Sequence, residues 1–268
     1  ILRCAACGLG ATFPVPAAGA LMEHNRRLYS AETRAGIYAV RRSEFDGRYA
    51  AYLDRIKRFK ADGNLLDVGC STGAFMAAAA DEGFSVSGVE LNADCAAYGR
   101  RHYGFDIRSG MFEDAAFSSG SFDVVTMFDV LEHSRDMAAM VSEARRVLRP
   151  GGLLVVQSPN LDSVMARVFR EDWAWLSPPD HLYHLTPGTM ARLLEGGGFR
   201  ISYSRTWETV RDLLGHIRFR AGAEDFVTRA MRKLVFVPGA LLLYLPQKLW
   251  CLAGRGGLIE VYATRNDS

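Results

Sequence analysis

The sequence predicts an α/β fold that is doubly wound around a mostly parallel sheet, because short apolar runs alternate with helical stretches of about ten residues. The clearest unit begins with the apolar run 65–68, passes through a glycine-containing turn at 69–73 and enters an alanine-rich helical stretch at 74–81. The composition supports a globular protein, since 49% of the 268 residues are hydrophobic and 23% are charged. These values exclude a disordered chain, a collagen and a coiled-coil rod.

The same alternation continues along the chain. We expect further strands at 85–89, near Ile107, at 122–127 and at 152–157, with helices at 93–102 and 137–148. After an aromatic, proline-rich loop at 173–184, we expect a helix at 186–196 and strands at 199–204 and 258–264. Ligands of parallel sheets bind at the carboxyl ends of the strands, so we expect the site in the loops after the first, second and fourth strands.

The chain divides into three predicted parts. Residues 1–17 contain Cys4-Ala-Ala-Cys7-Gly8, which is similar to half of a zinc ribbon, and we interpret this segment as the remnant of a Cys-containing, zinc-ribbon-like segment. A closed zinc site is not expected, because zinc takes four ligands and the sequence has no second pair of this kind. Residues 18–60 are rich in helix formers and predict a helical cap of roughly two or three helices. Residues 61–268 form the main domain, with an insertion at about 205–257.

Charge and cysteine usage limit the function classes. The 32 basic and 30 acidic residues leave a formal charge of +2, which argues against a nucleic-acid partner and favours a small-molecule ligand. The five cysteines are an odd number without a disulfide spacing pattern, and the N-terminus shows no secretory signal. We therefore expect a reducing, cytoplasmic location.

The turn at 67–73 supports three interpretations. Gly69-x-Ser71-x-Gly73 is the pattern of a serine hydrolase elbow, with Ser71 as the nucleophile. A dinucleotide fingerprint also starts at Gly69 but lacks its second glycine. A third pattern, Asp-x-Gly-x-Ser-x-Gly, also uses the leading Asp67. The elbow is disfavoured because only helical sequence precedes this strand, whereas elbows follow several strands.

Glu90 ends the next predicted strand, 17 residues after Gly73. An acid at this position accepts hydrogen bonds from the hydroxyls of a ribose. This feature fits both nucleotide-type interpretations of the turn.

Five motifs, in order, resemble those of the class I S-adenosylmethionine-dependent methyltransferases, in particular the bacterial branch near the ubiquinone-pathway O-methyltransferases. They are Leu66-Asp67-Val68-Gly69-Cys70, Gly88-Val89-Glu90-Leu91-Asn92, Ser121-Phe122-Asp123-Val124-Val125, Asp129-Val130-Leu131-Glu132-His133 and the Val-Leu-Arg-Pro-Gly-Gly of Val147–Gly152. The resemblance covers about residues 60–205. It implies a Rossmann-like, seven-stranded sheet with helices on both faces.

The resemblance also implies S-adenosyl-L-methionine as the cofactor and S-adenosyl-L-homocysteine as the product. The implied cofactor contacts are Asp67, Gly69, Cys70, Ser71, Gly73, Glu90, Leu91, Met111, Phe112, Glu113, Phe128 and Asp129. Ser71 stands where the family more often has Gly, and we expect its small side chain to fit. Met111 stands where relatives often have an acid for the adenine amino group. We expect the backbone of Phe112, apolar packing or Glu113 to replace that acid.

The resemblance further points to candidate metal ligands after the fourth strand. In the ubiquinone-pathway enzymes, an arrangement similar to Asp129, Glu132 and His133 is associated with a divalent metal. These residues could share one helical face and are the metal candidates. We favour a loop-fixing role for them and expect no metal.

The loop 173–184 follows the fifth strand, where this fold builds its substrate lid. We expect the methyl acceptor to contact Trp173, Trp175, Tyr183 and His184, with His133 and His181 as candidate general bases. The expected reaction is methylation of a small molecule, at the oxygen of a lipid-linked, sugar or phenolic acceptor. The alternatives are a non-catalytic cofactor-binding or membrane-docking protein and the serine hydrolase.

The insertion contains an apolar stretch, 234–247, of fourteen uncharged residues between Arg232-Lys233 and Lys248. It is shorter than the roughly 20 residues of a spanning helix, and two prolines interrupt it. Residues 200–255 hold ten Lys and Arg against four Asp and Glu, a net charge of +6. We expect this insertion to pack on the domain, to form a homodimer, or to touch the inner face of a membrane through 232–253.

Overall fold

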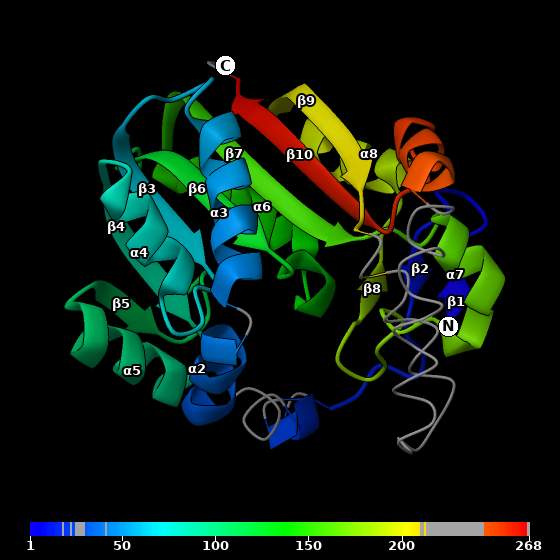
Figure 1. Cartoon of the computed structure of the whole chain (residues 1–268), viewed down its shortest axis with the longest axis horizontal. Coiled ribbons are helices and arrows are strands. Elements are labelled where there is room, and N and C mark those ends of the chain that lie inside the picture. Colours follow the sequence, from blue (N-terminus) through cyan, green and yellow to red (C-terminus); the bar gives the residue numbers. More distant parts are fainter. Residues whose placement is uncertain are drawn as a thin grey trace.

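A seven-stranded sheet runs through the molecule in the order β5-β4-β3-β6-β7-β10-β9 (Figure 1). The computed structural model describes residues 1–17, 19–21, 23–24, 30–40, 42–209, 212 and 244–266. The strands are β3 (Gly63–Val68), β4 (Phe84–Glu90), β5 (Asp106–Ser109), β6 (Phe122–Phe128), β7 (Leu148–Pro159), β9 (Phe199–Trp207) and β10 (Leu258–Arg265). Only β10 runs against its neighbours, β7 and β9. The predicted fold class, a mostly parallel doubly wound sheet, is confirmed.

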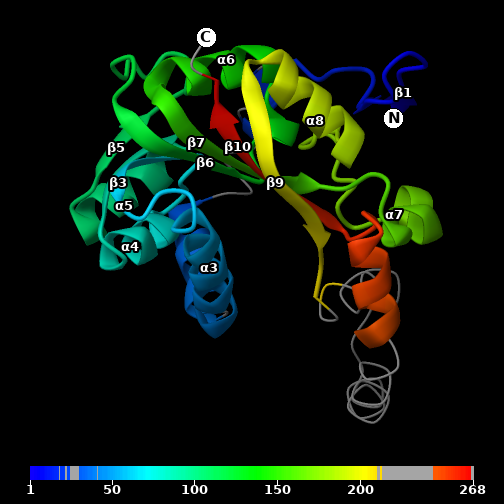
Figure 2. The ribbon, with the colours of Figure 1, turned by 90° about the horizontal axis from the view of Figure 1, so that it is seen from above.

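Helices cover both faces of the sheet, with α3 and α4 on one side and α6 and α8 on the other (Figure 2). The helices are α2 (Ala31–Val40), α3 (Arg42–Ile56), α4 (Ala74–Asp81), α5 (Ala93–Tyr103), α6 (Met137–Val147), α7 (Val164–Phe169) and α8 (Pro187–Gly196), with single turns η1 (Leu131–His133) and η2 (Arg170–Asp172). Most bounds lie within two residues of the expected ones. Strand β7 starts earlier than expected, because Leu148 already pairs with Phe122.

Two apolar cores lie on the two faces because successive strand residues point to opposite sides. Leu65 and Val124 belong to the core beneath α3 and α4. Leu66 and Val125, their neighbours in sequence, belong to the core beneath α6 and α8. Each strand is therefore apolar at consecutive positions, which is the pattern that marked these strands in the sequence.

The helical cap is anchored to the first of these cores. Tyr52, Leu53 and Ile56 of α3 are almost fully buried there. In Figure 1, α3 crosses the sheet in front of β3 and β6, and α2 continues from it towards α5 and the carboxyl ends of the strands. The cap is thus packed where it overhangs the predicted site.

The N-terminal segment takes part in a second, three-stranded sheet. Strands β1 (Leu2–Arg3) and β2 (Gly10–Ala11) form a hairpin, and β2 pairs with β8 (Tyr183–His184). Backbone N–H groups of Cys7 and Ala6 donate to the Cys4 sulfur and lower the pKa of this exposed thiol. The zinc-ribbon origin of the segment stays a prediction, but its first residues are ordered against the main domain.

The predicted insertion at 205–257 is described only at its two ends. Residues 210–211 and 213–243 lie outside the described residues, and 244–252 are helical. Among the described residues, no helix has the length and apolar character that crossing a bilayer requires.

Glu260 of β10 is a buried charge that joins the cap to the sheet. Its fully buried carboxylate accepts hydrogen bonds from Arg55 of α3 at 3.0 Å and from Arg205 of β9 at 2.8 Å. Arg205 Nε donates a further bond to it at 3.0 Å, and the Tyr262 hydroxyl donates one at 2.7 Å. Removing the negative charge of Glu260 would leave the guanidinium groups of Arg55 and Arg205 without a neutralising partner.

We expect Glu260→Gln to lower the free energy of unfolding by about 3 kcal/mol, because two guanidinium groups would then face a neutral amide. Urea denaturation measures this loss. The control is Glu82→Gln, which breaks the exposed Lys57–Glu82 pair at 2.6 Å and should change stability by less than about 1 kcal/mol. Equal losses in the two variants would contradict the assignment.

Candidate functional site

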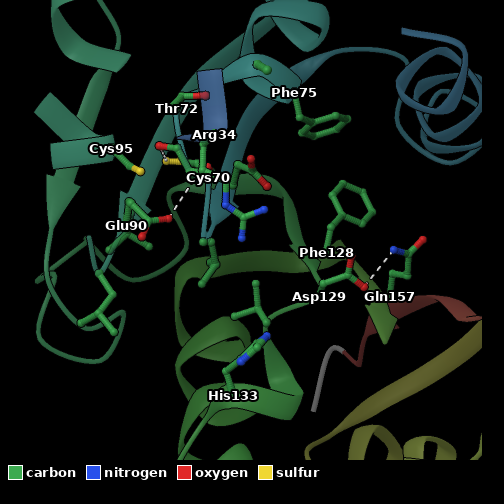
Figure 3. Close-up of a pocket in the computed structure, with 18 of the residues that line it drawn as sticks. Arg34, Cys70, Thr72, Phe75, Glu90, Cys95, Phe128, Asp129, His133 and Gln157 are labelled. Carbon is green, nitrogen blue, oxygen red and sulfur yellow. Dashed lines mark hydrogen bonds between the residues drawn. The ribbon is translucent and has the colours of Figure 1, made fainter. Parts of the chain in front are cut away.

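The carboxyl ends of β3, β4, β6 and β7 open into a cavity of about 320 Å³, which α2 and α3 overhang (Figure 3). Eleven of the residues singled out in the sequence line this cavity. They are Asp67, Gly69, Cys70, Ser71, Glu90, Leu91, Met111, Phe112, Phe128, Asp129 and His133. Residues from four separate strand ends therefore meet at one place, as the parallel sheet predicts.

The glycine turn after β3 needs a backbone that most side chains disfavour. Gly69 has a φ of 72°, and a Cβ there would lie 2.6 Å from Val130. Gly73 starts α4 with a φ of 87° and faces Tyr103, so it shapes the turn without lining the cavity. Ser71 adopts a φ of 51°, a left-handed conformation that is strained for a residue with a Cβ. The Ser71 side chain therefore fits in the space available, but the backbone at this position is strained.

Glu90 is held by the backbone at the end of β4. Its Oε2 accepts the Ser71 N–H at 2.8 Å, and its Oε1 accepts the Asn92 N–H at 2.7 Å. Each carboxylate oxygen retains a lone pair for a further donor. Burial raises the pKa of Glu90, and hydrogen bonds from the backbone N–H groups of Asn92, Ser71 and Leu91 oppose the shift. The carboxylate is therefore fixed at the cavity wall and able to accept hydroxyl groups.

Asp67, in β3, also lines the cavity. It is buried and accepts the Thr126 hydroxyl at 2.6 Å. Burial raises the pKa of Asp67 to about 7, against the effect of this hydrogen bond. A cationic group bound in the cavity would favour the charged form of Asp67.

The cavity extends past Glu90 to the segment after β5. Half-exposed Leu91 and Met111 and buried Phe112 provide apolar surface there. Glu113 does not line the cavity, so the structure does not bring it together with the other predicted cofactor residues. Glu113 lies in a turn in which the Asp114 N–H donates to Met111 O at 3.3 Å.

A polar chain crosses the opposite end of the cavity. The Tyr52 hydroxyl donates to Gln157 Oε1, and Gln157 Nε2 donates to Asp129 Oδ1 at 3.0 Å. Asp129 itself has a φ of 57° and donates its N–H to Gln157 O. Figure 3 shows Phe128, Asp129 and Gln157 side by side at the ends of β6 and β7. Tyr52 and Gln157 carried no sequence signal, since each lies in an otherwise ordinary helix or strand.

The cap adds charged and aromatic groups that sequence reasoning missed. Arg34 of α2 projects into the cavity between Glu90 and Asp129 (Figure 3). Arg48 of α3 also lines it, with its guanidinium 5.1 Å from the Trp207 ring. Tyr49 meets Phe75 edge to face at 5.4 Å and closes the wall. The only available signal was the recurrence of Arg and Tyr in the stretch 18–60.

His133 is oriented by Asp180, from a loop far along the chain. Its Nδ1 lies 3.0 Å from Asp180 O and 3.3 Å from Asp180 Oδ1, so Nδ1 carries the proton, which makes Nε2 the acceptor nitrogen of the neutral ring. Burial opposes protonation, but the bond to Asp180 and the charge of Glu132 outweigh it and raise the pKa of His133 to about 9. His133 therefore has the geometry of an acid–base group at the cavity.

His181 lies behind His133 and outside the cavity lining. Their rings meet edge to face at 4.7 Å, and His181 Nδ1 donates to Trp175 O at 2.9 Å. Burial and the nearby charge of His133 lower the pKa of His181 to about 4. Of the two predicted bases, only His133 reaches the cavity.

The metal candidates are grouped differently from the expected set. The donor atoms of Glu132, His133 and His181 lie within 4.8 Å of one another, whereas Asp129 bonds to Gln157 instead. A divalent ion requires neutral imidazoles, and Asp180 favours the protonated form of His133. Glu132 Oε2 already accepts the Ser158 hydroxyl at 3.0 Å. Its Oε1 is buried without a hydrogen-bond partner among the described residues. The expected absence of metal therefore stays a prediction.

The aromatic loop packs away from the cavity. Trp173 is buried, and Trp175 lies against Gly257, where a Cβ would meet its ring at 2.4 Å. Tyr183 donates its hydroxyl to Arg135 O at 3.2 Å, and His184 is buried beside Thr12 at 3.0 Å. The structure does not bring these four predicted acceptor contacts to the cavity, because pairing of β8 with β2 draws the loop towards the N-terminal hairpin.

The hydrolase alternative requires a histidine bonded to the Ser71 hydroxyl. Within the described part of the chain, no histidine forms such a bond, and the acid beside Ser71 binds its backbone N–H instead. The turn after β3 therefore lacks the partner that would activate a serine nucleophile.

We expect Ser71→Gly to raise the free energy of unfolding by about 1 kcal/mol, because relief of left-handed strain exceeds the entropy that Gly adds to the unfolded chain. Urea denaturation measures the change. Ala116→Gly is a matched control, since Ala116 has a φ of 54° outside the cavity lining. A less stable Ser71→Gly variant beside a stabilised Ala116→Gly variant would show that the Ser71 side chain supports the turn.

Comparison with known proteins places this site in a family. The family model described as a methyltransferase domain matches residues 41–203. A probable S-adenosylmethionine-dependent methyltransferase of Mycolicibacterium smegmatis is 32% identical over 155 residues, covering 58% of each protein. A ubiquinone biosynthesis O-methyltransferase of Thiobacillus denitrificans is 32% identical over 146 residues, 50% of this chain and 63% of that protein. The chain thus spans less than two thirds of either relative.

A solved S-adenosylmethionine-dependent methyltransferase of Archaeoglobus fulgidus shares the fold, with a TM-score of 0.59 and 20% identity, covering 84% of this chain and 94% of that one. The strand order, the Glu90 and glycine-turn cavity and the matched family model agree with one another. The chain therefore belongs to the class I S-adenosylmethionine-dependent methyltransferase family.

Proposed function

We propose that this chain transfers a methyl group from S-adenosyl-L-methionine to a hydroxyl oxygen of a small-molecule acceptor. The observation that carries the proposal is the shared cavity, in which the Glu90 carboxylate and the glycine turn lie with Asp129 and His133. S-adenosyl-L-methionine is the methyl donor of the family. The Thiobacillus denitrificans relative, named as an O-methyltransferase, supports oxygen as the acceptor atom.

The cavity offers a suitable group for each part of the cofactor. Glu90 would accept the ribose hydroxyls, since both of its oxygens are already oriented by backbone N–H groups. The open turn at 69–71 would admit the methionine portion close to the backbone. Leu91, Met111 and Phe112 would pack on the adenine, where the acid common in relatives is absent. Arg34 would face the methionine carboxylate from the cap.

The bound cofactor supplies an electrophilic methyl group on a sulfonium, so the protein must align the acceptor and exclude water. The overhanging helices α2 and α3 provide the exclusion. His133 Nε2 would take the hydroxyl proton, while Asp180 holds Nδ1 and stabilises the resulting imidazolium. A nearby sulfonium disfavours a second positive charge and would lower the pKa of His133 towards neutrality.

The acceptor class and location remain part of this proposal. Lipid-linked, phenolic and sugar hydroxyls are the first acceptors to screen, and a cytoplasmic location follows from cysteine usage. A second candidate function, non-catalytic cofactor binding, is motivated by Met111 at the position of the usual acid. Cofactor binding without turnover on any acceptor would favour this second candidate.

We expect S-adenosyl-L-homocysteine to bind the chain with micromolar affinity in a calorimetric titration, and NAD to give no heat. Glu90→Ala should weaken binding by about 1 to 3 kcal/mol, because the ribose would lose a charged acceptor. Glu113→Ala is the matched control, since Glu113 lies outside the cavity lining. This variant should bind S-adenosyl-L-homocysteine with the affinity of the wild-type chain. Wild-type affinity in Glu90→Ala would refute the ribose assignment, and absence of any binding would refute the function.

We expect kcat/KM for S-adenosyl-L-methionine to rise with pH up to about 9, because it reports the cofactor-free enzyme, in which His133 must lose its proton before it acts as a base. The rise in kcat should come at a lower pH than the rise in kcat/KM. kcat reports the enzyme with the cofactor bound, and the positive charge of the sulfonium lowers the pKa of His133 in that state. Asp180→Asn should move the profile to lower pH, and His133→Gln should abolish the rise with a large loss of kcat. His102→Gln, at an exposed position of α5, should leave the profile unchanged. A rise that persists in His133→Gln would exclude His133 as the base.

A further inference from the structure

The helical segment 244–252 presents an apolar stripe to the exterior. Leu245, Leu249 and Leu252 are 69%, 68% and 86% exposed. Their spacing of four and three residues places them on one helix face, where exposed Tyr244 and Lys248 also lie. We call these five residues the leucine face. Single exposed apolar residues are ordinary, whereas three large ones in a row on one helix mark a contact surface.

The opposite side of this helix is fastened to the sheet. Gln247 is buried and its Nε2 donates to Glu208 O, while Trp250 Nε1 donates to Glu208 Oε1. Thr206 Oγ1 donates to Cys251 O at 2.8 Å. These bonds fix the rotation of the helix about its axis. The leucine face therefore cannot turn inward without breaking them.

Charge is unevenly distributed along the sequence that contains this helix. Residues 200–255 hold ten Lys and Arg against four Asp and Glu, a net of +6. The rest of the chain holds 22 basic and 26 acidic residues, a net of −4. An apolar stripe within a basic sequence matches an anionic lipid surface, which attracts Lys and Arg and accepts leucine side chains at the acyl boundary.

Helix α7 lies beside the segment in both views (Figures 1 and 2). Val164 N–H donates to Arg255 O at 3.0 Å, which joins the start of α7 to the end of the segment. Val168 of α7 is 62% exposed, and Arg167 beside it is exposed as well. Glu171 and Asp172, also exposed, follow α7 in η2. Apolar and basic groups thus continue past the helical segment.

We propose that the leucine face docks this chain peripherally on an anionic bilayer. A second copy is the less suitable occupant, because a symmetric dimer through this face would bring the Lys248 side chains of two copies into one interface. Spanning is not required, since the described helices include none suited to cross a membrane. The docking proposal does not depend on methyl transfer and is tested without it.

The buried side of this helix is anchored next to a residue that contacts the cavity wall. Glu208, which anchors the helix, follows Trp207, whose ring lies 6.3 Å from the Tyr52 ring and 5.1 Å from the Arg48 guanidinium. Tyr52 and Arg48 line the cavity. The leucine face and the cavity are therefore connected through a short, packed stretch at the end of β9.

The test is co-sedimentation of the full chain with phosphatidylcholine vesicles, with and without phosphatidylglycerol. We expect binding at least about tenfold tighter to the anionic vesicles, weakening as salt rises. The double variant Leu249→Ser and Leu252→Ser should bind at least about tenfold more weakly, because two inserted side chains lose their apolar area. Equal binding of this variant and the wild-type chain would overturn the proposal.

Two controls separate docking from other uses of the leucine face. The double variant Leu249→Met and Leu252→Met keeps the apolar area and should bind like the wild type. Val15→Ser, at an exposed apolar residue of the N-terminal segment, should also bind like the wild type. Loss of vesicle binding in Val15→Ser would assign the effect to general surface hydrophobicity and overturn the proposal.

Thermal unfolding and light scattering of the same variants complete the test. Docking predicts an unchanged midpoint and an unchanged molar mass in the Ser variant, since the leucines are exposed in the free chain. A dimer that dissociates on this substitution, with no vesicle binding by the wild type, would assign the face to a second copy. A lowered midpoint with no vesicle binding would assign it to another segment of this chain. Either result would overturn lipid docking.

Discussion

Strand β3 pairs in parallel with β4 on one side and with β6 on the other, and the arrangement of the site depends on this double pairing. The chain leaves β3 towards β4 and β5, then crosses back to β6 and β7, so the direction of strand addition reverses at β3. The loops on its two sides diverge at that point and leave a crevice. Glu90 and Asp129 come from β4 and β6, and they share one cavity only because these strands end level with β3.

The cap helices serve the core and the cavity together. Residues 52, 53 and 56 of α3 fill the core on one face of the sheet, and Arg55 pairs with buried Glu260. The same helix supplies Arg48 and Tyr52 to the cavity wall. Binding-site geometry and stability are therefore coupled through α3, because it cannot shift to admit a ligand without disturbing buried contacts. Helix α2 makes fewer buried contacts than α3, so a shift of α2 costs less free energy.

Electrostatics divide the cavity into two ends. Near β4, the backbone holds a carboxylate that is suited to hydroxyl groups. Near η1, Asp180 and Glu132 favour a protonated His133, and burial keeps the adjoining His181 neutral. A cationic ligand between these ends would be attracted by Glu90, Asp67 and Asp129 and would discourage protonation of His133. Binding of a cation and release of the histidine proton are thus linked, which suits a base that acts only when the cavity is filled.

The sequence by itself determined the fold class, the order of nearly every element and the groups nearest the strand ends, because hydrophobic periodicity and glycine turns are local properties. Asp67, Gly69 and Glu90 were identifiable for this reason. Tertiary structure alone decided which distant groups complete the cavity. Arg34 and Gln157 sit in ordinary helical and strand patterns, and Asp180 reaches His133 across 47 residues. It also decided that the aromatic loop packs against the N-terminal hairpin, because pairing of β2 with β8 depends on a contact between opposite ends of the chain.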